Sequence, residues 1–232
     1  MNVIITGASQ GIGFAVAAAF AADGHRLLLC SRNAKKLYDA VSELQKRFPQ
    51  AEIKAQPADM SVKEEILAFA NWCLSYGSPD ILVNNAGRFL PGNVSEEEEG
   101  VLEDMIQTNL YSAYHLTRQL IKPMMAAGSG HVFNICSIAA LQAYTNGGSY
   151  SISKFALNGF TKNLREEMKP HGIKVTAVHP GATMSGSWDG FDIDPKRIME
   201  AADVAKMIHA AAGLSPMAVM EEIILRPQLG DL

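Results

Sequence analysis

The chain of 232 residues carries 20 Lys and Arg against 24 Asp and Glu, which gives a formal net charge of −4. This balance, without a cluster of basic residues, argues against nucleic acid or an anionic membrane as the main partner. Apolar content of 48% and charged content of 19% are typical of a globular protein with a sizeable core, and no apolar run reaches membrane-spanning length.

Short runs rich in β-branched residues alternate with amphipathic stretches of helix length. The predicted strands are Asn2–Ile5, Arg26–Cys30, Glu52–Gln56, Ile81–Val83, His131–Cys136, Lys174–Val178 and Glu222–Leu225. The predicted helices are Ile12–Asp23, Ala34–Phe48, Val62–Tyr76, Glu96–Ala127, Ser151–Lys169 and Ala202–Ala212. The strands show little polar alternation, as expected where helices cover both faces of a sheet. This order predicts an α/β fold in one domain, 1–232: a doubly wound parallel sheet of about seven strands.

Two helix starts have local signals. Ser61 followed by Glu64 is a capping-box pattern. The acidic run Glu96–Glu99 follows Ser95, and carboxylates at a helix N-terminus suit the helix dipole, so we expect a solvated first turn there.

Cysteine and histidine spacing excludes two kinds of site. The three cysteines show no C-x-x-C pattern, which predicts buried thiols in a reducing, cytoplasmic compartment. The six histidines show no H-x-H or H-x-x-x-H spacing, so no metal site is expected.

The first predicted strand leads into TGASQGIG and then directly into a helix. Its three glycines allow a sharp turn and a close backbone approach to a pyrophosphate, and the helix N-terminus offers free N–H groups. The alternative is a tight turn without a ligand, but a position after the first strand of an alternating series favours nucleotide binding. The candidate cofactor-binding residues here are Thr6, Gly7, Ser9, Gln10, Gly11, Ile12 and Gly13.

The residues after the second strand bear on the choice of coenzyme. Ser31 and Arg32 stand here, and no acidic residue occurs before Asp39. Sites that select NAD place a carboxylate near this point, whereas an arginine accommodates the 2′-phosphate of NADP. NADP(H) is therefore favoured over NAD(H), the alternative being that Arg32 is an ordinary solvated side chain.

Tyr150 and Lys154 lie four residues apart in a stretch of small residues that reads as a helix, which would place them on one face. A cation beside a phenol lowers the phenol pKa and makes a usable proton donor at neutral pH. Taken alone, this pair could be a coincidence.

With the glycine loop, the pair resembles the short-chain dehydrogenase/reductase family, in its compact single-domain branch, over essentially the whole chain. Six motifs in order carry the resemblance: TGASQGIG for T-G-x-x-x-G-x-G, NNAG at Asn84–Gly87, Asn109 in its helix, Ser137 after strand five, Tyr150–Lys154 for Y-x-x-x-K, and HPG ending at Gly181. The resemblance implies a Rossmann-like fold and four catalytic residues, Asn109, Ser137, Tyr150 and Lys154.

The resemblance also implies further coenzyme contacts. Asp59 would bond the adenine amino group, although it could instead cap a helix. The other contacts would come from Met60, Asn85, Ala86, Gly87, Tyr150, Lys154, Pro180 and Gly181. Where the family often has a threonine four residues after the glycine of the P-G turn, this chain has Ser185, with Thr183 two positions earlier; either hydroxyl could reach the nicotinamide amide or a phosphate. Gln10 stands where many NADP-using relatives have a basic residue, so the NADP preference depends on Arg32.

The implied reaction is hydride transfer between a nicotinamide and a carbonyl carbon. Tyr150 would donate the proton, and Lys154 would lower the tyrosine pKa and hold the ribose hydroxyls. Ser137 would bond the developing oxyanion, and Asn109 would fix a water that relays protons to Lys154. An alternative of another class is a non-catalytic NADP(H)-sensing regulatory protein of the same fold, which the presence of Ser137, Tyr150 and Lys154 disfavours.

The substrate is expected to be a small carbonyl or alcohol compound. Ile138–Ala143 would line an apolar pocket, and Ala182–Ile193 is predicted to be a mobile lid. Because this lid contains no Arg or Lys, an uncharged ketone or aldehyde, or a β-ketoacyl thioester, is favoured. The resemblance implies a homo-oligomer, a tetramer or dimer, built through the two long helices and the C-terminal strand.

Overall fold

The computed structural model describes residues 1–186 and 194–231, and its centre is one sheet of seven strands. The strands are β1 (Asn2–Thr6), β2 (Arg26–Cys30), β3 (Glu52–Ala55), β4 (Ile81–Asn84), β5 (Gly130–Ile135), β6 (Ile173–Pro180) and β7 (Glu222–Leu225). They run parallel in the order β3-β2-β1-β4-β5-β6-β7. The Rossmann-like, doubly wound fold predicted from the sequence is confirmed.

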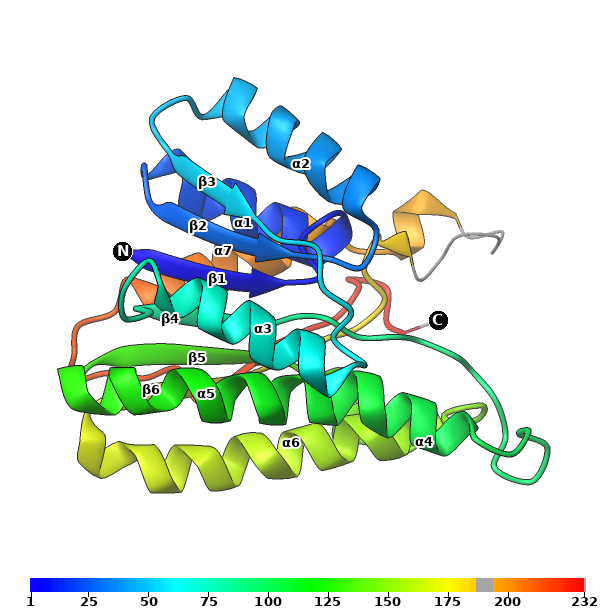
Figure 1. Ribbon diagram of the computed structural model, residues 1–232. Coiled ribbons are helices and arrows are strands. Elements are labelled where there is room, and N and C mark those ends of the chain that lie inside the picture. Colours follow the sequence, from blue (N-terminus) through cyan, green and yellow to red (C-terminus); the bar gives the residue numbers. More distant parts are fainter. Residues whose placement is uncertain (187–193, 232) are drawn as a thin grey trace.

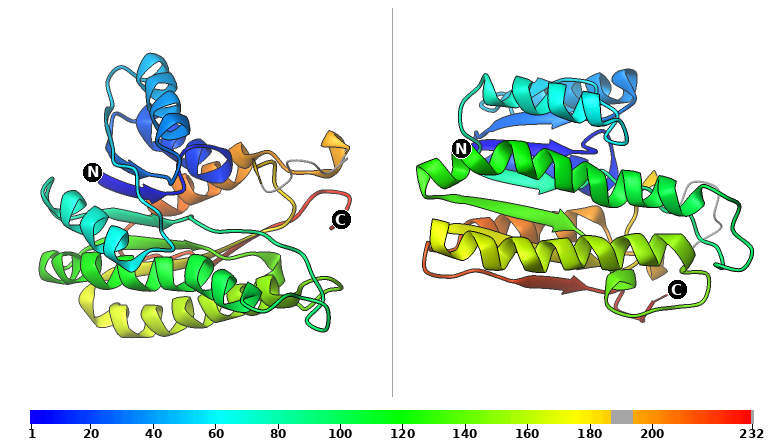
Figure 2. Two further views of the ribbon diagram at one scale, coloured as in Figure 1. Left: turned by 45° about the vertical axis from the view of Figure 1, so that its right-hand side comes forward. Right: turned by 60° about the horizontal axis from the view of Figure 1, so that its bottom comes forward.

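Helices cover both faces of the sheet (Figures 1 and 2). They are α1 (Gly11–Ala22), α2 (Ala34–Arg47), α3 (Lys63–Leu74), α4 (Val101–Ile106), α5 (Ser112–Ala127), α6 (Gly148–Met168) and α7 (Ala201–Ala212). Helices α1, α2 and α7 lie on one face, and α3, α5 and α6 lie on the other. The central strands are buried on both sides, which explains why their sequences lack polar alternation.

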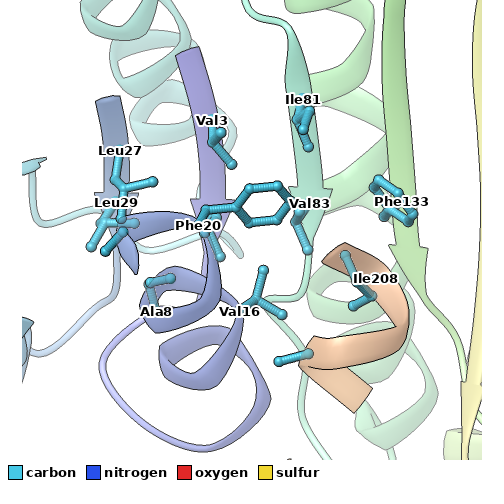
Figure 3. Packing of buried hydrophobic residues seen from close by; sticks show 14 of the residues in the cluster. Val3, Ala8, Val16, Phe20, Leu27, Leu29, Ile81, Val83, Phe133 and Ile208 are labelled. Atoms are coloured by element: carbon cyan, nitrogen blue, oxygen red, sulfur yellow. The ribbon is translucent and has the colours of Figure 1, made fainter. Parts of the chain in front are cut away.

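Each face of the sheet has its own apolar core. On the α1 side, Phe20 and Val16 pack against Val3 and Val83 of the central strands, and Ile208 of α7 closes the cluster (Figure 3). All five side chains are at most 1% exposed. These two cores fix the strand ends in space, and thereby the loops that extend from them.

The largest departure from the predicted elements concerns the long helix Glu96–Ala127. Helix α4 begins only at Val101, and a π-helical turn, Gln107–Tyr111, joins it to α5. The acidic run Glu96–Glu99 lies in turns before α4, so the expected solvated helix start was wrong. Long-range contacts of Glu97, described below, account for this difference.

The capping box expected at Ser61 and Glu64 is also absent. The N-cap of α3 is Val62, and the Ser61 hydroxyl donates to the Asp59 carboxylate at 2.7 Å. Glu65, rather than Glu64, accepts a backbone bond, from the Asp59 N–H at 2.7 Å. The Ser61 hydroxyl is therefore bound to the nearby Asp59 carboxylate instead of capping the helix.

The predicted burial of the three cysteines is confirmed, because Cys30, Cys73 and Cys136 are all buried free thiols. Within the described residues, no helix is long and apolar enough to cross a membrane. Most of the predicted lid, 187–193, lies outside the described residues.

Candidate active site

A cavity of about 760 Å³ opens at the carboxyl edge of the sheet. The strand order reverses between β1 and β4, and loops that diverge at such a switch point form a crevice. The cavity is lined by the loop after β1 and by residues that follow β2, β3, β4, β5 and β6. Segments from the whole length of the chain therefore meet in one place.

The glycine loop forms one end of the cavity. Gly7 has φ +66°, and a Cβ there would lie 2.8 Å from Nδ2 of Asn85. A Cβ on Gly13 would overlap the Gly7 carbonyl, so both positions require glycine. The Thr6 hydroxyl accepts bonds from the backbone N–H of Asn85 and of Ala86, at 3.0 and 2.9 Å. Thr6 and Gly13 thus shape the loop without lining the cavity, and their contact with the coenzyme stays a prediction.

The N-terminus of α1 faces this end of the cavity. Ser9, Gln10, Gly11 and Ile12 line the cavity, as predicted. The N-cap residue Gln10 makes no side-chain capping bond, and the first turn contains no acidic residue. Neither the Gln10 side chain nor an acidic residue of the first turn competes for the amide groups of this helix end, which suit a pyrophosphate group.

The cavity extends past the end of β2, where an adenosine 2′-phosphate would lie. Ser31 and Arg32 line it as predicted, and the Ser31 hydroxyl lies 2.9 Å from that of Ser9. Lys36, in the first turn of α2, also lines the cavity and supplies a second cation. The sequence interpretation missed Lys36, although a position one turn beyond Arg32 at a helix start was a usable signal.

Asp59 and Met60 line the same end as predicted, and the N-cap of α3 is Val62 rather than Asp59. The strand β3 ends at Ala55, and Asp59 lies in the connection that follows. One carboxylate oxygen of Asp59 accepts from the N–H and the hydroxyl of Ser61, at 2.9 and 2.7 Å.

The residues after β4 and β6 face each other across the middle of the cavity. Asn85, Ala86 and Gly87 line one wall; Pro180, Gly181, Thr183 and Ser185 line the other. The Thr183 hydroxyl donates to the Gly181 carbonyl at 2.9 Å, within its own turn. Ser185 packs on the glycine loop, since a Cβ on Gly11 would lie 2.9 Å from the Ser185 Cβ. Of the two hydroxyl residues left open by the sequence, Ser185 is the one that lies beside the phosphate loop.

Ser137, Tyr150 and Lys154 come together in the same cavity. Ser137 follows β5 and is 7% exposed, its hydroxyl accepts a bond from the Ala139 N–H at 3.1 Å, and its side chain acts on the pKa of Tyr150. Tyr150 is the third residue of α6, and the Lys154 Nζ lies one turn further on, 5.8 Å from the centre of the Tyr150 ring. His179 hydrogen-bonds the backbone of Ser137, with its Nδ1 2.9 Å from the Ser137 carbonyl oxygen.

The electrostatics of this cluster differ from the expectation. Burial raises the pKa of Tyr150 to about 12, and the Ser137 side chain opposes this rise only in part. Burial also lowers the pKa of Lys154 to about 8. The Lys154 Nζ donates to the Ile135 carbonyl at 2.9 Å rather than to the phenol. The predicted lowering of the tyrosine pKa by Lys154 is therefore wrong in this structure, and Tyr150 remains protonated across neutral pH.

Asn109 lies in the π-helical turn, 1% exposed, and does not line the cavity. Its carboxamide accepts from the Arg88 N–H at 2.7 Å and donates to the Arg88 carbonyl at 3.0 Å. It also donates to the Ser153 hydroxyl at 2.9 Å. Its side chain thus ties the segment after β4 to α6, and the proton relay expected of Asn109 stays a prediction.

The part of the cavity next to Tyr150 has an apolar and aromatic wall. Ile138, Ala139, Gln142 and Ala143 line it, from the stretch Ile138–Ala143 predicted to do so. Tyr144 and Phe89 add two aromatic rings to this wall. Phe89 also packs edge-to-face on Tyr150, with the two ring centroids 4.9 Å apart.

Three charged residues that the sequence interpretation missed also line the cavity: Arg88, Arg226 and Asp231. They come from the β4 connection and from the end of the chain, so no local signal connected them with Tyr150. The argument for an uncharged substrate, which rested on the lack of Arg or Lys in Ala182–Ile193, is therefore not supported. Within the described residues, no group of three His, Cys, Asp or Glu side chains could hold a metal ion.

Glu97 caps the helix that carries Tyr150. Its carboxylate accepts a bond from the backbone N–H of Ser149 at 2.9 Å and another from the Ser149 hydroxyl. Gly148, with φ +38°, has no room for a Cβ against Glu97 and Gly92. A negative charge at a helix N-terminus is stabilising, so the loop after β4 is docked on the first turn of α6.

The sequence matches the short chain dehydrogenase family over residues 1–192. A Staphylococcus saprophyticus protein described as an uncharacterized oxidoreductase is 32% identical over 231 residues, covering 97% of this chain and 96% of that protein.

Solved structures of similar shape include an alcohol dehydrogenase from the archaeon Thermococcus sibiricus, complexed with 5-hydroxy-NADP. It has a TM-score of 0.91 and 26% identity, covering 98% of this chain and 96% of the other. Actinorhodin polyketide ketoreductase with NADPH has a TM-score of 0.89 and 27% identity, covering 100% and 97%.

Proposed function

The chain belongs to the short-chain dehydrogenase family of oxidoreductases, and on this premise we propose that it interconverts a carbonyl group and an alcohol with NADP(H). The carbonyl would be that of a ketone, an aldehyde or a β-ketoacyl compound. The observation that carries the proposal is the position of Ser137, Tyr150 and Lys154 in one cavity with the glycine loop. When bound, the coenzyme supplies the hydride chemistry.

The residues of the chain then have separate tasks. The glycine loop and the N-terminus of α1 would bind the pyrophosphate, and the side chain of the N-cap residue Gln10 does not compete with it for the amide groups there. Tyr150, which is protonated at neutral pH, would deliver a proton to the carbonyl oxygen as negative charge develops on it. Ser137 would donate a hydrogen bond to the same oxygen, a contact that strengthens in the transition state.

Lys154 is proposed to bind the ribose hydroxyls and to compensate charge on Tyr150. Its pKa of about 8 leaves it largely protonated at pH 7, and it lies one turn from Tyr150 on the same helix. Asn109, tied to Arg88 and Ser153, is proposed to act as a positioning residue for α6.

The proposed preference for NADP(H) is supported by the cations at the end of the cavity beyond β2. Arg32 and Lys36 both line it, and an arginine fork matches a phosphate bidentately. The alcohol dehydrogenase and the ketoreductase named above were solved with NADP-type coenzymes, which agrees with this proposal.

The deciding experiment replaces Tyr150 with Phe and follows NADPH oxidation with a panel of diketones and β-ketoesters. We expect NADPH to bind normally and turnover to fall at least about 100-fold, because only the proton donor is lost. A Phe variant that keeps more than about a tenth of the wild-type kcat would exclude Tyr150 as the acid.

The alternative function is a regulatory protein that senses NADP(H) without turnover. It shares the coenzyme site but needs no acid, and so gives no reason for Ser137 and Tyr150 to lie together in the cavity. NADPH binding without oxidation across the whole panel would favour this alternative.

We also propose a cytoplasmic homo-oligomer, a tetramer or dimer. Buried free thiols suit a reducing compartment. Large apolar side chains that are 37–45% exposed on the α5 and α6 side support an interface there: Tyr111, Tyr114, Ile152 and Phe155. A monomer in light scattering at micromolar concentration would contradict the assembly.

A further inference from the structure

The cavity is electropositive, although the chain as a whole carries a net charge of −4. Among the described residues that line it, the acidic side chains are Asp59 and Asp231, and the basic ones are Arg32, Lys36, Arg88, Lys154 and Arg226. Arg32, Lys36 and Asp59 belong to the coenzyme end. Of the other lining cations, Arg88 forms an ion pair with Asp104 at 3.6 Å, and Lys154 is assigned above to the ribose of the coenzyme, which leaves Arg226 to be considered for an anionic group of the substrate.

Arg226 is placed beside the turn after β6 by the register of the sheet. Leu225, the last residue of β7, pairs with Pro180, and its carbonyl accepts the Gly181 N–H at 2.8 Å. Arg226 follows directly, at the level of the Pro180–Gly181 turn that lines the cavity. The chain end returns to this edge of the sheet, where the strands finish (Figure 1).

The counter-ion of Arg226 is a carboxylate inside the same cavity. An Arg226 guanidinium nitrogen forms an ion pair with Asp231, and the other Asp231 oxygen lies 3.2 Å from where a Gly181 Cβ would be. Arg197 holds the Asp231 backbone, donating to its carbonyl at 3.3 Å. A carboxylate that belongs to the protein thus sits against the turn proposed to contact the nicotinamide.

The exposure of this ion pair allows a ligand carboxylate to replace Asp231 at Arg226. The side chains of Arg226 and Asp231 are 41% and 34% exposed. An ion pair that is so exposed to solvent contributes little to stability, so a ligand carboxylate of equal charge can replace Asp231 at little cost. The planar guanidinium matches a carboxylate with two parallel hydrogen bonds, which adds orientation to attraction.

We propose that Arg226 binds a carboxylate of the substrate in exchange for Asp231, and that the substrates are oxo acids and the corresponding hydroxy acids. This inference rests on the proposed function and narrows its substrate class. The apolar wall formed by Ile138, Phe89 and Tyr144 would then hold the carbon chain between the carboxylate and the reacting carbonyl.

The test compares 3-oxo acids of about four to eight carbons with their methyl esters, using NADPH and measuring kcat/KM. For the wild type we expect the acids to be favoured at least about tenfold over the esters. Arg226→Gln should lower kcat/KM for the acids at least about tenfold and change that for the esters less than about twofold. Asp231→Asn should raise kcat/KM for the acids a few-fold, because it removes the competing carboxylate. Arg47→Gln removes an arginine from a half-exposed ion pair far from the cavity and is the matched control.

Two results would overturn the inference and leave the proposed function intact. One is equal use of acids and esters by the wild type. The other is an equal loss for both series in Arg226→Gln, which would make the ion pair a latch for the chain end. If neither acids nor esters nor the diketone panel is turned over although NADPH binds, the proposed function fails, and this inference fails with it.

Discussion

Replacing Lys154 with Met is predicted to make the folded protein more stable and nearly inactive. Lys154 is 6% exposed, and burial lowers its pKa from 10.5 to about 8. The folded state therefore holds an ammonium where its charge is poorly solvated. Met keeps the apolar stem without the charge, so it removes this cost together with the contact proposed for the coenzyme.

The size of the effect follows from the pKa. A difference between 10.5 and about 8 corresponds to about 3 kcal/mol of lost stability at pH values below both. The variant also loses the bond from Nζ to the Ile135 carbonyl, worth about 1–2 kcal/mol. The net gain at pH 7 is about 1–2 kcal/mol, or about 2–8 °C in Tm for a chain of this size.

The pH dependence of the stability difference shows whether burial of the Lys154 ammonium is its cause. Because the folded pKa of Lys154 is lowered, the unfolded chain binds more protons between about pH 8 and 10.5. Wild-type stability therefore rises relative to Lys154→Met across that window. The advantage of the variant is full at pH 7 and is lost near pH 10.5.

The assay is urea unfolding of both proteins at pH 7 to 10, with NADPH binding measured by fluorescence and kcat measured in parallel. The matched control is Lys162→Met, eight residues further along α6, where the lysine side chain is 52% exposed. Its stability relative to wild type should not change with pH between about 8 and 10. A variant that is less stable than wild type at pH 7, or a difference that is the same at pH 7 and pH 10, would refute the burial argument. An unchanged NADPH Kd would refute the ribose contact.

Arg32→Ala should lower kcat/KM with NADPH about ten- to a hundredfold and leave NADH nearly unaffected, because a charge-assisted bond to the 2′-phosphate is worth about 1.5–3 kcal/mol. An equal effect on both coenzymes would make Arg32 a plain surface residue. Glu97→Ala should lower kcat several-fold without changing the NADPH Kd, since it releases the first turn of α6; exposed Glu98→Ala is its control, and an unchanged kcat would limit Glu97 to a stabilising role. Burial lowers the pKa of His131 from 6.5 to about 3, so the unfolded chain binds more protons in that window. The stability advantage of wild type over His131→Asn should therefore shrink as pH falls from 6.5 towards 3, and a constant difference in urea unfolding would contradict this.

The sequence alone was enough to predict the sheet, the glycine loop and the Tyr150–Lys154 pair. Each of these depends on residues close together in the chain: apolar runs of strand length, glycines spaced for a turn into a helix, and a spacing of four on one helix face. Local geometry follows from local sequence here because backbone sterics and hydrogen bonding act over a few residues. The predicted strand at Glu222–Leu225 even has the observed ends.

The tertiary structure alone decided the contacts between distant segments. Glu97 contacts Ser149 across 52 residues, and so a run of carboxylates that suggests a solvated helix start serves instead as a cap for another helix. Arg226 reaches the cavity only because β7 pairs with β6, which no pattern near Arg226 indicates. The pKa of Tyr150 was predicted in the wrong direction for the same reason. Spacing places a lysine beside a phenol, but the pKa depends on how much water the fold removes from each group, and burial is a property of the assembled tertiary structure.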